Sequence, residues 1–358
     1  MKGYGMIKAG EAGWMEKDRP VAGPLDAIVR PTVIAPCSSD THVFHGGFGP
    51  DVKNLILGHE AVGEVVEVGA LVKNFKPGDI VVVPCCNPNF IDKHTQGTGW
   101  ANAHDDGKRF FGGFKFLEKK DGVWGEFFHV NLADANLALL PEGVKPEAAL
   151  MTVDMMSTGF HGVENADIQF GDTVVVMGIG PVGLMCVAGA KLKGAARIIV
   201  TGTRPNCIAV AKEYGATDII NYKKGDIVEQ IQNLVGGNGT VDSVIIAGGG
   251  QETLPQALRL AKPTGNVSNV NFFDGKDVFT IPAPYWGLGM GNITIRGGFC
   301  PGGALRIEKL MNLIKFGKVD TTKLITHRYE GFDKIPEAFD VMAKKPADLI
   351  KPVVFIKW

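Results

Sequence analysis

The sequence lacks an excess of charge of either sign. Its 37 Lys and Arg residues nearly balance its 38 Asp and Glu residues, and the formal net charge is −1 at pH 7. No basic run or face of mixed aromatic and basic residues is present. The electrostatic footprint that nucleic acids and anionic membrane surfaces require is therefore absent. We expect no nucleic-acid partner and no membrane partner.

A leader and long apolar runs are also missing. The segment from Met1 to Lys8 lacks the apolar core of a signal peptide, and no apolar stretch is long enough to span a membrane. The 6 cysteines are scattered, at positions 37, 85, 86, 186, 207 and 300. Such spacing differs from the dense disulfide framework of small secreted domains. These absences predict a protein of the reducing cytoplasm.

The chain is long enough for two domains, and its apolar pattern changes near residue 145. Before that point, short valine-rich strands are expected without intervening helices, which favours a barrel-like β domain. Their ranges are 26–35, 60–69, 79–84 and 125–130. A helix is expected over 146–161, and from Thr173 strands alternate with helices, as in a doubly wound parallel sheet. The closing strand, 349–357, has no helical partner and is expected to return to the β domain.

The strongest motif follows the apolar strand that begins at Thr173. A glycine-rich turn with the pattern Gly-x-Gly-x-x-Gly leads from this strand into an apolar helix over 184–193. The glycines permit a tight turn, close approach of a pyrophosphate and close helix–strand packing. The strand, the turn and the helix together predict a dinucleotide site. The turn consists of Gly178, Ile179, Gly180, Pro181, Val182 and Gly183.

The end of the next strand, 197–201, indicates which dinucleotide binds. An NAD site carries Asp or Glu about 20 residues beyond the glycine turn, where it binds the ribose hydroxyls. Here Gly202, Thr203 and Arg204 stand instead. Glycine would leave room for a 2′-phosphate, threonine can donate a hydrogen bond, and arginine offers a planar cationic fork. NADP is therefore favoured over NAD.

Three further side chains stand out against apolar surroundings. Cys37 closes a strand, His59 and Glu60 follow an apolar run, and Asp154 lies inside the run 149–156. A thiolate, an imidazole and a carboxylate match the three protein ligands of a catalytic zinc site. Each residue also has an ordinary structural explanation, as a core thiol, a hydrogen-bonded strand residue or a helix cap. The spacing alone leaves both interpretations open.

Five segments together resemble the zinc-dependent medium-chain alcohol dehydrogenases, and within them the NADP-dependent secondary-alcohol dehydrogenases of anaerobic microbes. The resemblance covers essentially the whole chain. It implies a β-rich GroES-like catalytic domain over 1–156 and 299–358, and a Rossmann domain that binds NADP over 157–298. The segments are 35–40, 56–64, 154–162, 178–185 and 348–354.

The resemblance also implies a role for individual residues. Cys37, His59 and Asp154 would bind zinc, and Glu60 would be a neighbouring or exchanging ligand. Ser39 would start a proton relay that His42 continues. Tyr222 would join Gly202, Thr203 and Arg204 around the 2′-phosphate. Further cofactor contacts would come from Val270, Asn271, Phe272 and Lys345.

Where many relatives hold a structural zinc with four cysteines, this chain has only the pair Cys85-Cys86. Four ligands cannot be assembled there, so we expect one catalytic zinc per subunit and no structural zinc. The pair lines the substrate pocket or packs a strand end, and the pocket is favoured. On the family pattern, Phe114, Phe299 and Cys300 complete that pocket.

These features predict an NADP- and zinc-dependent enzyme that oxidises small secondary alcohols such as 2-propanol to ketones by hydride transfer, and reduces the ketones in reverse. Relatives suggest a homotetramer. Two alternatives remain open. One is a zinc polyol or threonine dehydrogenase on the same fold, and the other is an NADP-binding module that has lost catalysis.

Overall fold

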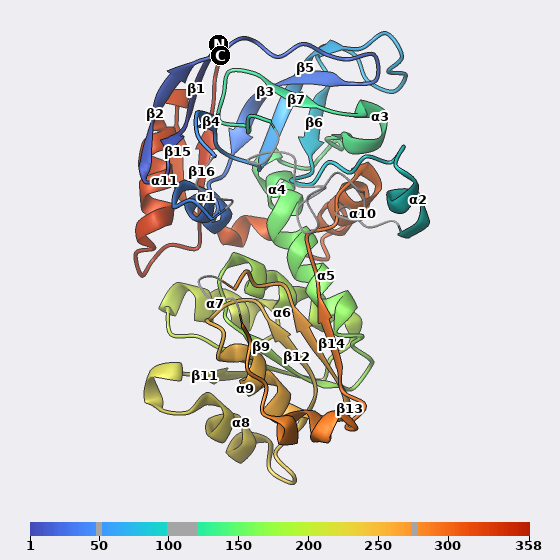
Figure 1. Ribbon diagram of the computed structural model, residues 1–358, viewed down its shortest axis with the longest axis vertical. Coiled ribbons are helices and arrows are strands. Elements are labelled where there is room, and N and C mark those ends of the chain that lie inside the picture. Colours follow the sequence, from blue (N-terminus) through green and yellow to red (C-terminus); the bar gives the residue numbers. More distant parts are fainter. Residues whose placement is uncertain (48–51, 99–119, 274–277) are drawn as a thin grey trace. The chain divides into compact units, whose positions relative to one another are not determined.

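The computed structural model in Figure 1 describes residues 1–47, 52–98, 120–273 and 278–358. The chain divides into two units. Unit 1 comprises residues 1–157 and 300–358, and unit 2 comprises residues 158–299. Unit 2 is therefore inserted into unit 1 along the sequence. In the described ranges, no helix is both long and apolar enough to cross a membrane.

Unit 1 is built on a seven-stranded sheet in the order β15-β16-β3-β5-β6-β8, with β7 paired to β3. The four expected N-terminal strands all form, and the expected return of the closing strand is confirmed, because β16 pairs antiparallel with β3 through Val354 and Ile34. The strands are β3 (Ala27–Ile34), β5 (Ala61–Val68), β6 (Ile80–Val83), β7 (Phe128–Val130), β8 (Ala138–Leu139), β15 (Ile325–Glu330) and β16 (Lys351–Phe355).

A second sheet in unit 1 was not expected from the sequence. It has the order β2-β1-β4, formed by β1 (Lys2–Lys8), β2 (Glu11–Glu16) and β4 (Leu55–Ile56). β1 and β2 contain glycines, and β4 has only two residues, so these strands give no clear alternation of apolar and polar residues. The helices of unit 1 are α1 (Ser38–Phe44), α2 (Lys93–Thr98), α3 (Ala133–Asn136), α4 (Pro146–Met151), α10 (Ala304–Lys315) and α11 (Ile335–Lys344), with 3-10 turns η4 (Thr321–Leu324) and η5 (Phe332–Lys334).

The single helix expected over 146–161 is interrupted in the structure. It consists of α4, a π-helical turn η1 (Thr152–Met156) and α5 (Ser157–Asn165). A π turn adds a residue to the helical repeat, and such turns occur frequently at functional sites. Asp154 is at the middle of this turn. Periodicity could not reveal the interruption, because every residue from Thr152 to Met156 is buried.

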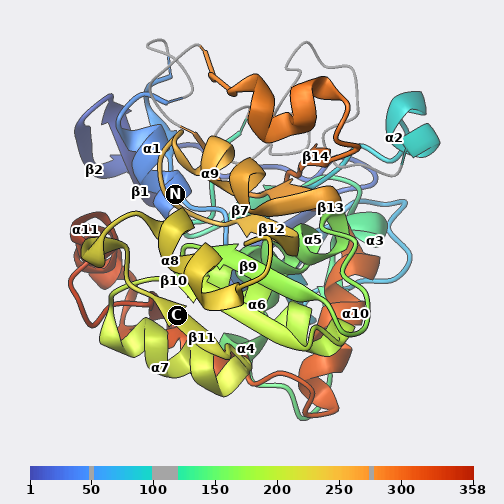
Figure 2. The ribbon, with the colours of Figure 1, turned by 90° about the horizontal axis from the view of Figure 1, so that it is seen from below.

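Unit 2 is the expected doubly wound sheet, with six parallel strands in the order β11-β10-β9-β12-β13-β14. Figure 2 shows α6 on one side of the strands and α8 and α9 on the other. The strands are β9 (Thr173–Met177), β10 (Arg197–Thr201), β11 (Asp218–Ile220), β12 (Val241–Ile246), β13 (Ala261–Asn269) and β14 (Thr294–Gly297). The helices are α6 (Pro181–Lys193), α7 (Pro205–Tyr214), α8 (Ile227–Val235) and α9 (Thr253–Leu260), with 3-10 turns η2 (Tyr222–Lys224) and η3 (Ala283–Gly289).

The strand order of unit 2 reverses between β9 and β12. The chain runs outward from β9 to β10 and β11, and then from β12 to β13 and β14. In open parallel sheets, ligands bind beyond the carboxyl ends of the strands at such a switch point. The turn after β9 is the glycine-rich segment of the sequence analysis, so the topology places it where a dinucleotide would bind.

Candidate active site and metal centre

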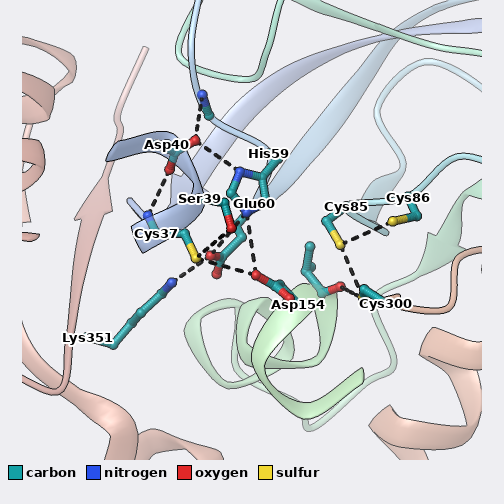
Figure 3. A network of polar contacts seen from close by, with 12 residues as sticks. Cys37, Ser39, Asp40, His59, Glu60, Cys85, Cys86, Asp154, Cys300 and Lys351 are labelled. Atoms are coloured by element: carbon teal, nitrogen blue, oxygen red, sulfur yellow. Dashed lines mark hydrogen bonds and ion pairs between the residues drawn. The ribbon is translucent and has the colours of Figure 1, made fainter. Parts of the chain in front are cut away.

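Four side chains of unit 1 that could hold a metal ion converge, as Figure 3 shows. One donor atom from each of Cys37, His59, Glu60 and Asp154 lies within 4.8 Å of every other. Cys37 caps the start of α1 rather than closing a strand as expected, because β3 ends three residues earlier, at Ile34. His59 and Glu60 directly precede β5, and Asp154 comes from the π turn.

The spacing of these donors fits a tetrahedral ion. Asp154 Oδ2 is 3.5 Å from Cys37 Sγ and 3.4 Å from His59 Nε2. Ligands bound tetrahedrally at about 2.0–2.3 Å are separated from one another by roughly 3.3–3.8 Å. A thiolate, an imidazole and a carboxylate are ligands that zinc accepts. The cluster therefore fits zinc both in its chemistry and in its distances.

Burial within the cluster is uneven. His59 and Glu60 are 1% and 0% exposed, whereas Cys37 and Asp154 are 7% and 8% exposed. All four donors are nevertheless buried, and the small exposed fraction of the cluster belongs to Cys37 and Asp154.

Asp40 organises two of the four donors. It is fully buried, and its Oδ2 accepts a hydrogen bond of 2.7 Å from the backbone N–H of Cys37. Its Oδ1 lies 3.0 Å from His59 Nδ1 and accepts a 3.2 Å bond from the backbone N–H of Gly58. With the Nδ1 proton directed at Asp40, His59 Nε2 presents a lone pair to the cluster.

Asp40→Asn should lower the affinity for zinc about 10- to 100-fold, as is typical when the partner of a metal-bound histidine is lost. The asparagine amide would direct an N–H group at the backbone N–H of Cys37 or at the Nδ1 proton of His59, where the carboxylate now accepts a hydrogen bond. Zinc affinity measured by chelator competition tests this expectation. Asp134→Asn is the matched control, because Asp134, on α3, also accepts backbone hydrogen bonds, from Lys73 and Asn74, but these bonds are exposed. Equal affinity in both variants would contradict the role of Asp40.

Behind the metal donors, Glu60 forms a buried ion pair. Its Oε1 accepts a 2.5 Å bond from Lys351 Nζ, and both side chains are 0% exposed. Among the described residues, the second oxygen, Oε2, has no hydrogen-bond partner. A buried carboxylate oxygen without a partner is costly, and binding of a cation would remove that cost. Glu60 is therefore held by Lys351 on one side, with its other oxygen available to a cation.

The protonation equilibria reflect the crowding of anionic groups. Burial raises the pKa of Glu60 to about 7, although Lys351 opposes the rise, and Asp154 adds to it. Burial also raises the pKa of the Cys37 thiol, with Lys351 again opposing and Asp154 contributing. The metal-free cluster is therefore electrostatically strained, and a divalent cation would relieve the strain by favouring the deprotonated donors.

Ser39 and His42 are the residues to which the sequence analysis assigned a proton relay. Ser39 Oγ lies 3.7 Å from Cys37 Sγ, so the hydroxyl borders the metal donors. Both residues are half-buried on α1. They are three positions apart and therefore share one face of the helix.

The glycine turn of unit 2 has the geometry that a dinucleotide requires. Gly178 has φ +89°, and a Cβ on Gly183 would lie 1.9 Å from the carbonyl oxygen of Gly178, so helix and strand pack closely only with glycine there. A Cβ on Gly180 would have a single neighbour within 4.0 Å, the guanidinium of Arg204. The space beside Gly180 is thus open and has a cation at its edge, which suits a phosphate.

The residues expected around the 2′-phosphate lie together at the end of β10. Thr203 Oγ1 donates a 2.9 Å hydrogen bond to the hydroxyl of Tyr222, and Arg204 caps α7. Tyr222 begins the 3-10 turn η2. A Cβ at Gly202 would lie 2.3 Å from Ile179, so packing against Ile179 is a further reason for glycine at this position.

The remaining expected cofactor residues occupy separate places. Val270 and Asn271 follow β13, and Asn271 Nδ2 donates to the carbonyl of Gly249 at 2.9 Å, which links the loops after β12 and β13. Phe272, in the same loop, is 44% exposed. Lys345 belongs to unit 1, at the end of α11, where its φ is +47°.

Two of the expected pocket residues, Cys85 and Cys300, are in contact, with their Sγ atoms 3.3 Å apart. Cys86 joins them, its Sγ 3.8 Å from that of Cys85. Phe299 precedes Cys300 in the chain but belongs to unit 2, and Phe114 lies outside the described residues.

Asp40 and Lys351 were not expected to belong to the site, although the sequence around each residue gives a reason to expect it. Asp40 stands three residues after Cys37, which is the spacing of a helix-start carboxylate that reaches back to the preceding N–H. Lys351 interrupts the apolar run 349–354. A charge in such a run is costly unless it is paired, and this argument, applied to Asp154, applies equally to Lys351.

Comparisons with known proteins agree with this geometry. A family model described as zinc-binding dehydrogenase matches residues 181–316, and one described as alcohol dehydrogenase GroES-like domain matches residues 23–142. The alcohol dehydrogenase TADH from Thermus sp. ATN1 is a solved structure with a TM-score of 0.87 and 28% identity, and the alignment covers 100% of both chains. The expected GroES-like and Rossmann folds are confirmed.

Full-length relatives are more similar in sequence. The NADP-dependent isopropanol dehydrogenase of Thermoanaerobacter brockii is 55% identical over 357 residues, which cover 99% of this chain and 100% of the relative. The enzyme of the same name from Clostridium beijerinckii is 56% identical over the same shares of the two chains. The chain therefore belongs to the zinc-dependent medium-chain alcohol dehydrogenase family.

Proposed function

We propose that the protein oxidises small secondary alcohols such as 2-propanol to ketones with NADP, and catalyses the reverse reduction. The observation that carries the proposal is the convergence of Cys37, His59 and Asp154 at tetrahedral spacing beside Ser39. The relatives named NADP-dependent isopropanol dehydrogenase support the choice of cofactor and substrate.

Zinc at this cluster would act as a Lewis acid that lowers the pKa of an alcohol and polarises a ketone. Cys37, His59 and Asp154 would hold it, and Asp40 would orient His59. Glu60, paired with Lys351, would be a neighbouring or exchanging ligand. We propose one such ion per subunit. The structural zinc of many relatives needs four ligands. Among the described residues, the other group of possible ligands, Cys85, Cys86 and Cys300, offers three.

Proton movement would use α1. Ser39 Oγ would accept the hydroxyl proton of the alcohol and pass its own hydroxyl proton on toward His42. Because the two residues share one face of α1 and are half-buried, the relay would lead from the enclosed donors toward solvent. The half-buried state of Ser39 would also limit water near the reacting carbon.

The open space beside Gly180 would receive the pyrophosphate of NADP at the start of α6. Thr203, Arg204 and Tyr222 would bind the 2′-phosphate, and no carboxylate stands at the end of β10 to repel it. Val270, Asn271 and Phe272 would border the nicotinamide, and Lys345 would supply a further contact. On this assignment unit 2 is the cofactor domain, and unit 1 is the catalytic domain.

Arg204→Ala should raise the KM for NADP about 10- to 100-fold, the loss expected when a charge-assisted hydrogen bond to phosphate is removed. The KM for NAD should change little, since NAD has no 2′-phosphate. Initial rates with both cofactors measure the two constants. Lys212→Ala, on the exposed face of the same helix α7, controls for the lost positive charge. Equal effects on NADP and NAD would show that the phosphate is not recognised by Arg204.

The function itself is tested with purified, metal-analysed protein. Turnover of 2-propanol with NADP, and of acetone with its reduced form, supports the proposal when one equivalent of zinc is bound per chain. Turnover of primary alcohols or polyols alone would overturn the substrate assignment. A protein that binds NADP but holds no stoichiometric zinc would overturn the enzymatic assignment.

The remaining proposals concern the cellular context. We propose the cytoplasm as the compartment, because in the described part of the chain no cysteine is in a disulfide.

We also propose a homotetramer. Unit 2 exposes a run of large apolar side chains that association would cover. They are Val278, Phe279, Trp286, Leu288 and Met290.

A further inference from the structure

Besides the candidate metal donors, unit 1 holds a cluster of three cysteine sulfur atoms. The Sγ atoms of Cys85, Cys86 and Cys300 all lie within 4.8 Å of one another. Two of the separations are 3.3 and 3.8 Å. The side chains are 1%, 0% and 7% exposed. Figure 3 shows them on the side of Asp154 away from Lys351, with Cys85 at the centre of the contacts.

The backbone holds the three thiols in place. Asn87 is fully buried, and its Nδ2 donates a 2.8 Å hydrogen bond to the carbonyl of Pro84, which closes the turn that contains Cys85 and Cys86. The segment after Cys300 packs directly on this turn. A Cβ on Gly302 would lie 2.2 Å from the carbonyl oxygen of Cys86. The sulfur atoms therefore converge without a rearrangement of the backbone.

The separations suit an acceptor bound by three sulfurs. With bonds as long as zinc–sulfur bonds, about 2.3 Å, three sulfurs in a pyramidal or planar arrangement lie about 3.5–4.0 Å apart. Thiolates select soft acceptors. No histidine or carboxylate belongs to this cluster in the described part of the chain, so a tetrahedral zinc site of the usual composition is not formed.

The net charge of the occupied site distinguishes between soft acceptors of different valence. Three thiolates would leave a monovalent ion with a net charge of −2 and a divalent ion with −1, in a buried place close to the acidic groups Glu60 and Asp154. A trivalent acceptor is neutralised completely, which avoids the cost of burying a net charge. In the absence of an acceptor the Cys85 thiol stays protonated, since hydrogen bonds to Cys300 and Cys86, together with burial, raise its pKa well above the ordinary value.

We propose that Cys85, Cys86 and Cys300 form a binding site for trivalent thiophilic acceptors, of which trivalent arsenic is the probe. Arsenous acid carries three hydroxyl groups. Each thiol gives its proton to one of them, three waters leave, and three arsenic–sulfur bonds form. Arsenic remains trivalent and each sulfur remains at the thiol level, so no oxidant or reductant is needed.

Occupancy of this site would also affect the neighbouring metal centre. Cys300 Sγ lies 3.9 Å from the carbonyl oxygen of Val153, the residue before Asp154. Bound arsenic would therefore press on the turn that carries a metal donor, and we expect arsenite to inhibit turnover. This expectation of inhibition, unlike the binding itself, rests on the proposed function.

The test uses the full-length, zinc-loaded protein and sodium arsenite, without substrate. We expect one arsenic atom per chain to survive desalting, with zinc retained, when both are measured by inductively coupled plasma mass spectrometry. Arsenic X-ray absorption should show three sulfur neighbours. One or two sulfur neighbours, or loss of arsenic on desalting, would overturn the proposal whatever alcohol the enzyme oxidises.

Variants locate the site. Cys85→Ala and Cys300→Ala should each weaken arsenite binding about 100-fold or more, because one of three linked contacts is removed. Cys186→Ala is the matched control, since Cys186 is also fully buried but lies on α6 of unit 2. Wild-type affinity in the first two variants, or equal weakening in the third, would contradict the assignment. The absorption measurement on the wild-type protein remains decisive if a variant does not fold.

Discussion

Asp154→Asn should lower kcat for 2-propanol by about 10³-fold or more while leaving the metal-free protein as stable as the wild type. The amide cannot supply the anionic oxygen that sits at tetrahedral spacing from Cys37 Sγ and His59 Nε2. Loss of Lewis-acid stabilisation worth several kcal/mol corresponds to a rate loss of this size. Zinc content measures the loss of the ligand, and steady-state kinetics on the same preparation measure the loss in kcat.

Stability separates a functional role for Asp154 from a structural one. In the metal-free chain, Asp154 raises the pKa of Glu60 and contributes to the raised pKa of Cys37, so it repels both. Asp154 also accepts a hydrogen bond from the Cys37 thiol and lies 3.4 Å from His59 Nε2. The repulsion and these favourable contacts offset one another, so loss of the charge should change the free energy of unfolding of the metal-free protein little. Denaturant titration in the presence of a chelator tests this. A destabilised, zinc-replete and active variant would refute the assignment of Asp154 as a metal ligand.

Lys351→Met should destabilise the protein by about 3–5 kcal/mol, the effect of removing one partner of a buried ion pair. Both Lys351 and Glu60 are fully buried, and the methionine side chain can fill the space but cannot neutralise the carboxylate. Chemical denaturation of metal-free protein measures the loss. Lys344→Met is the matched control, because the pair of Lys344 with Asp340 is exposed on α11 and should contribute little.

The loss in Lys351→Met should grow with pH. Burial already raises the pKa of Glu60 to about 7 with Lys351 present, and without the lysine it should rise further. A carboxyl whose folded pKa lies above its unfolded pKa destabilises the fold progressively as pH rises from the unfolded value to the folded one. For the wild type this decline ends near pH 7, and for the variant it continues above pH 7. The difference in unfolding free energy should therefore widen between pH 6 and pH 8.

A double variant tests the pairing directly. Glu60→Gln combined with Lys351→Met removes both charges, and replacing a buried ion pair by uncharged groups is often nearly neutral. The double variant should thus be more stable than Lys351→Met alone, with a coupling energy well above the scatter of independent sites. Additive losses would mean that Lys351 stabilises the fold through packing and not through Glu60.

The sequence was most informative where one local rule determines the structure. The strands of unit 2 are apolar runs bounded by glycine and helix starts, and the glycine turn combines a strand, three spaced glycines and a helix. Each signal lies within about 30 residues, so no long-range contact is needed to interpret it. The return of β16 to β3 could also be anticipated, because a strand without a following helix has no place in an alternating sheet.

Other features depend on contacts between distant segments. The π turn at Asp154 is invisible in a run where every side chain is buried, and β1 and β4 pair across about 50 residues of chain with little apolar alternation. The packing of Gly202 is another example, because a Cβ there would lie 2.3 Å from Ile179, a contact that only the folded turn reveals.

The metal donors are intermediate cases. Cys37, His59, Glu60 and Asp154 stood out as polar side chains in apolar surroundings, but their spacing left a zinc site and ordinary core roles equally open. The family resemblance then favoured the zinc site. Asp40 and Lys351 escaped notice because no motif includes them, although burial of a charge gives each a physical reason. A search for charged residues inside apolar runs would have found Lys351 from the sequence alone.

The insertion of unit 2 into unit 1 has a consequence for biosynthesis. All four donors precede unit 2 in the chain, whereas Lys351 follows it. During translation the four donors therefore leave the ribosome first, and the lysine that pairs with Glu60 emerges only after the whole inserted unit. The buried ion pair between Glu60 and Lys351 cannot form before synthesis of unit 2 is complete.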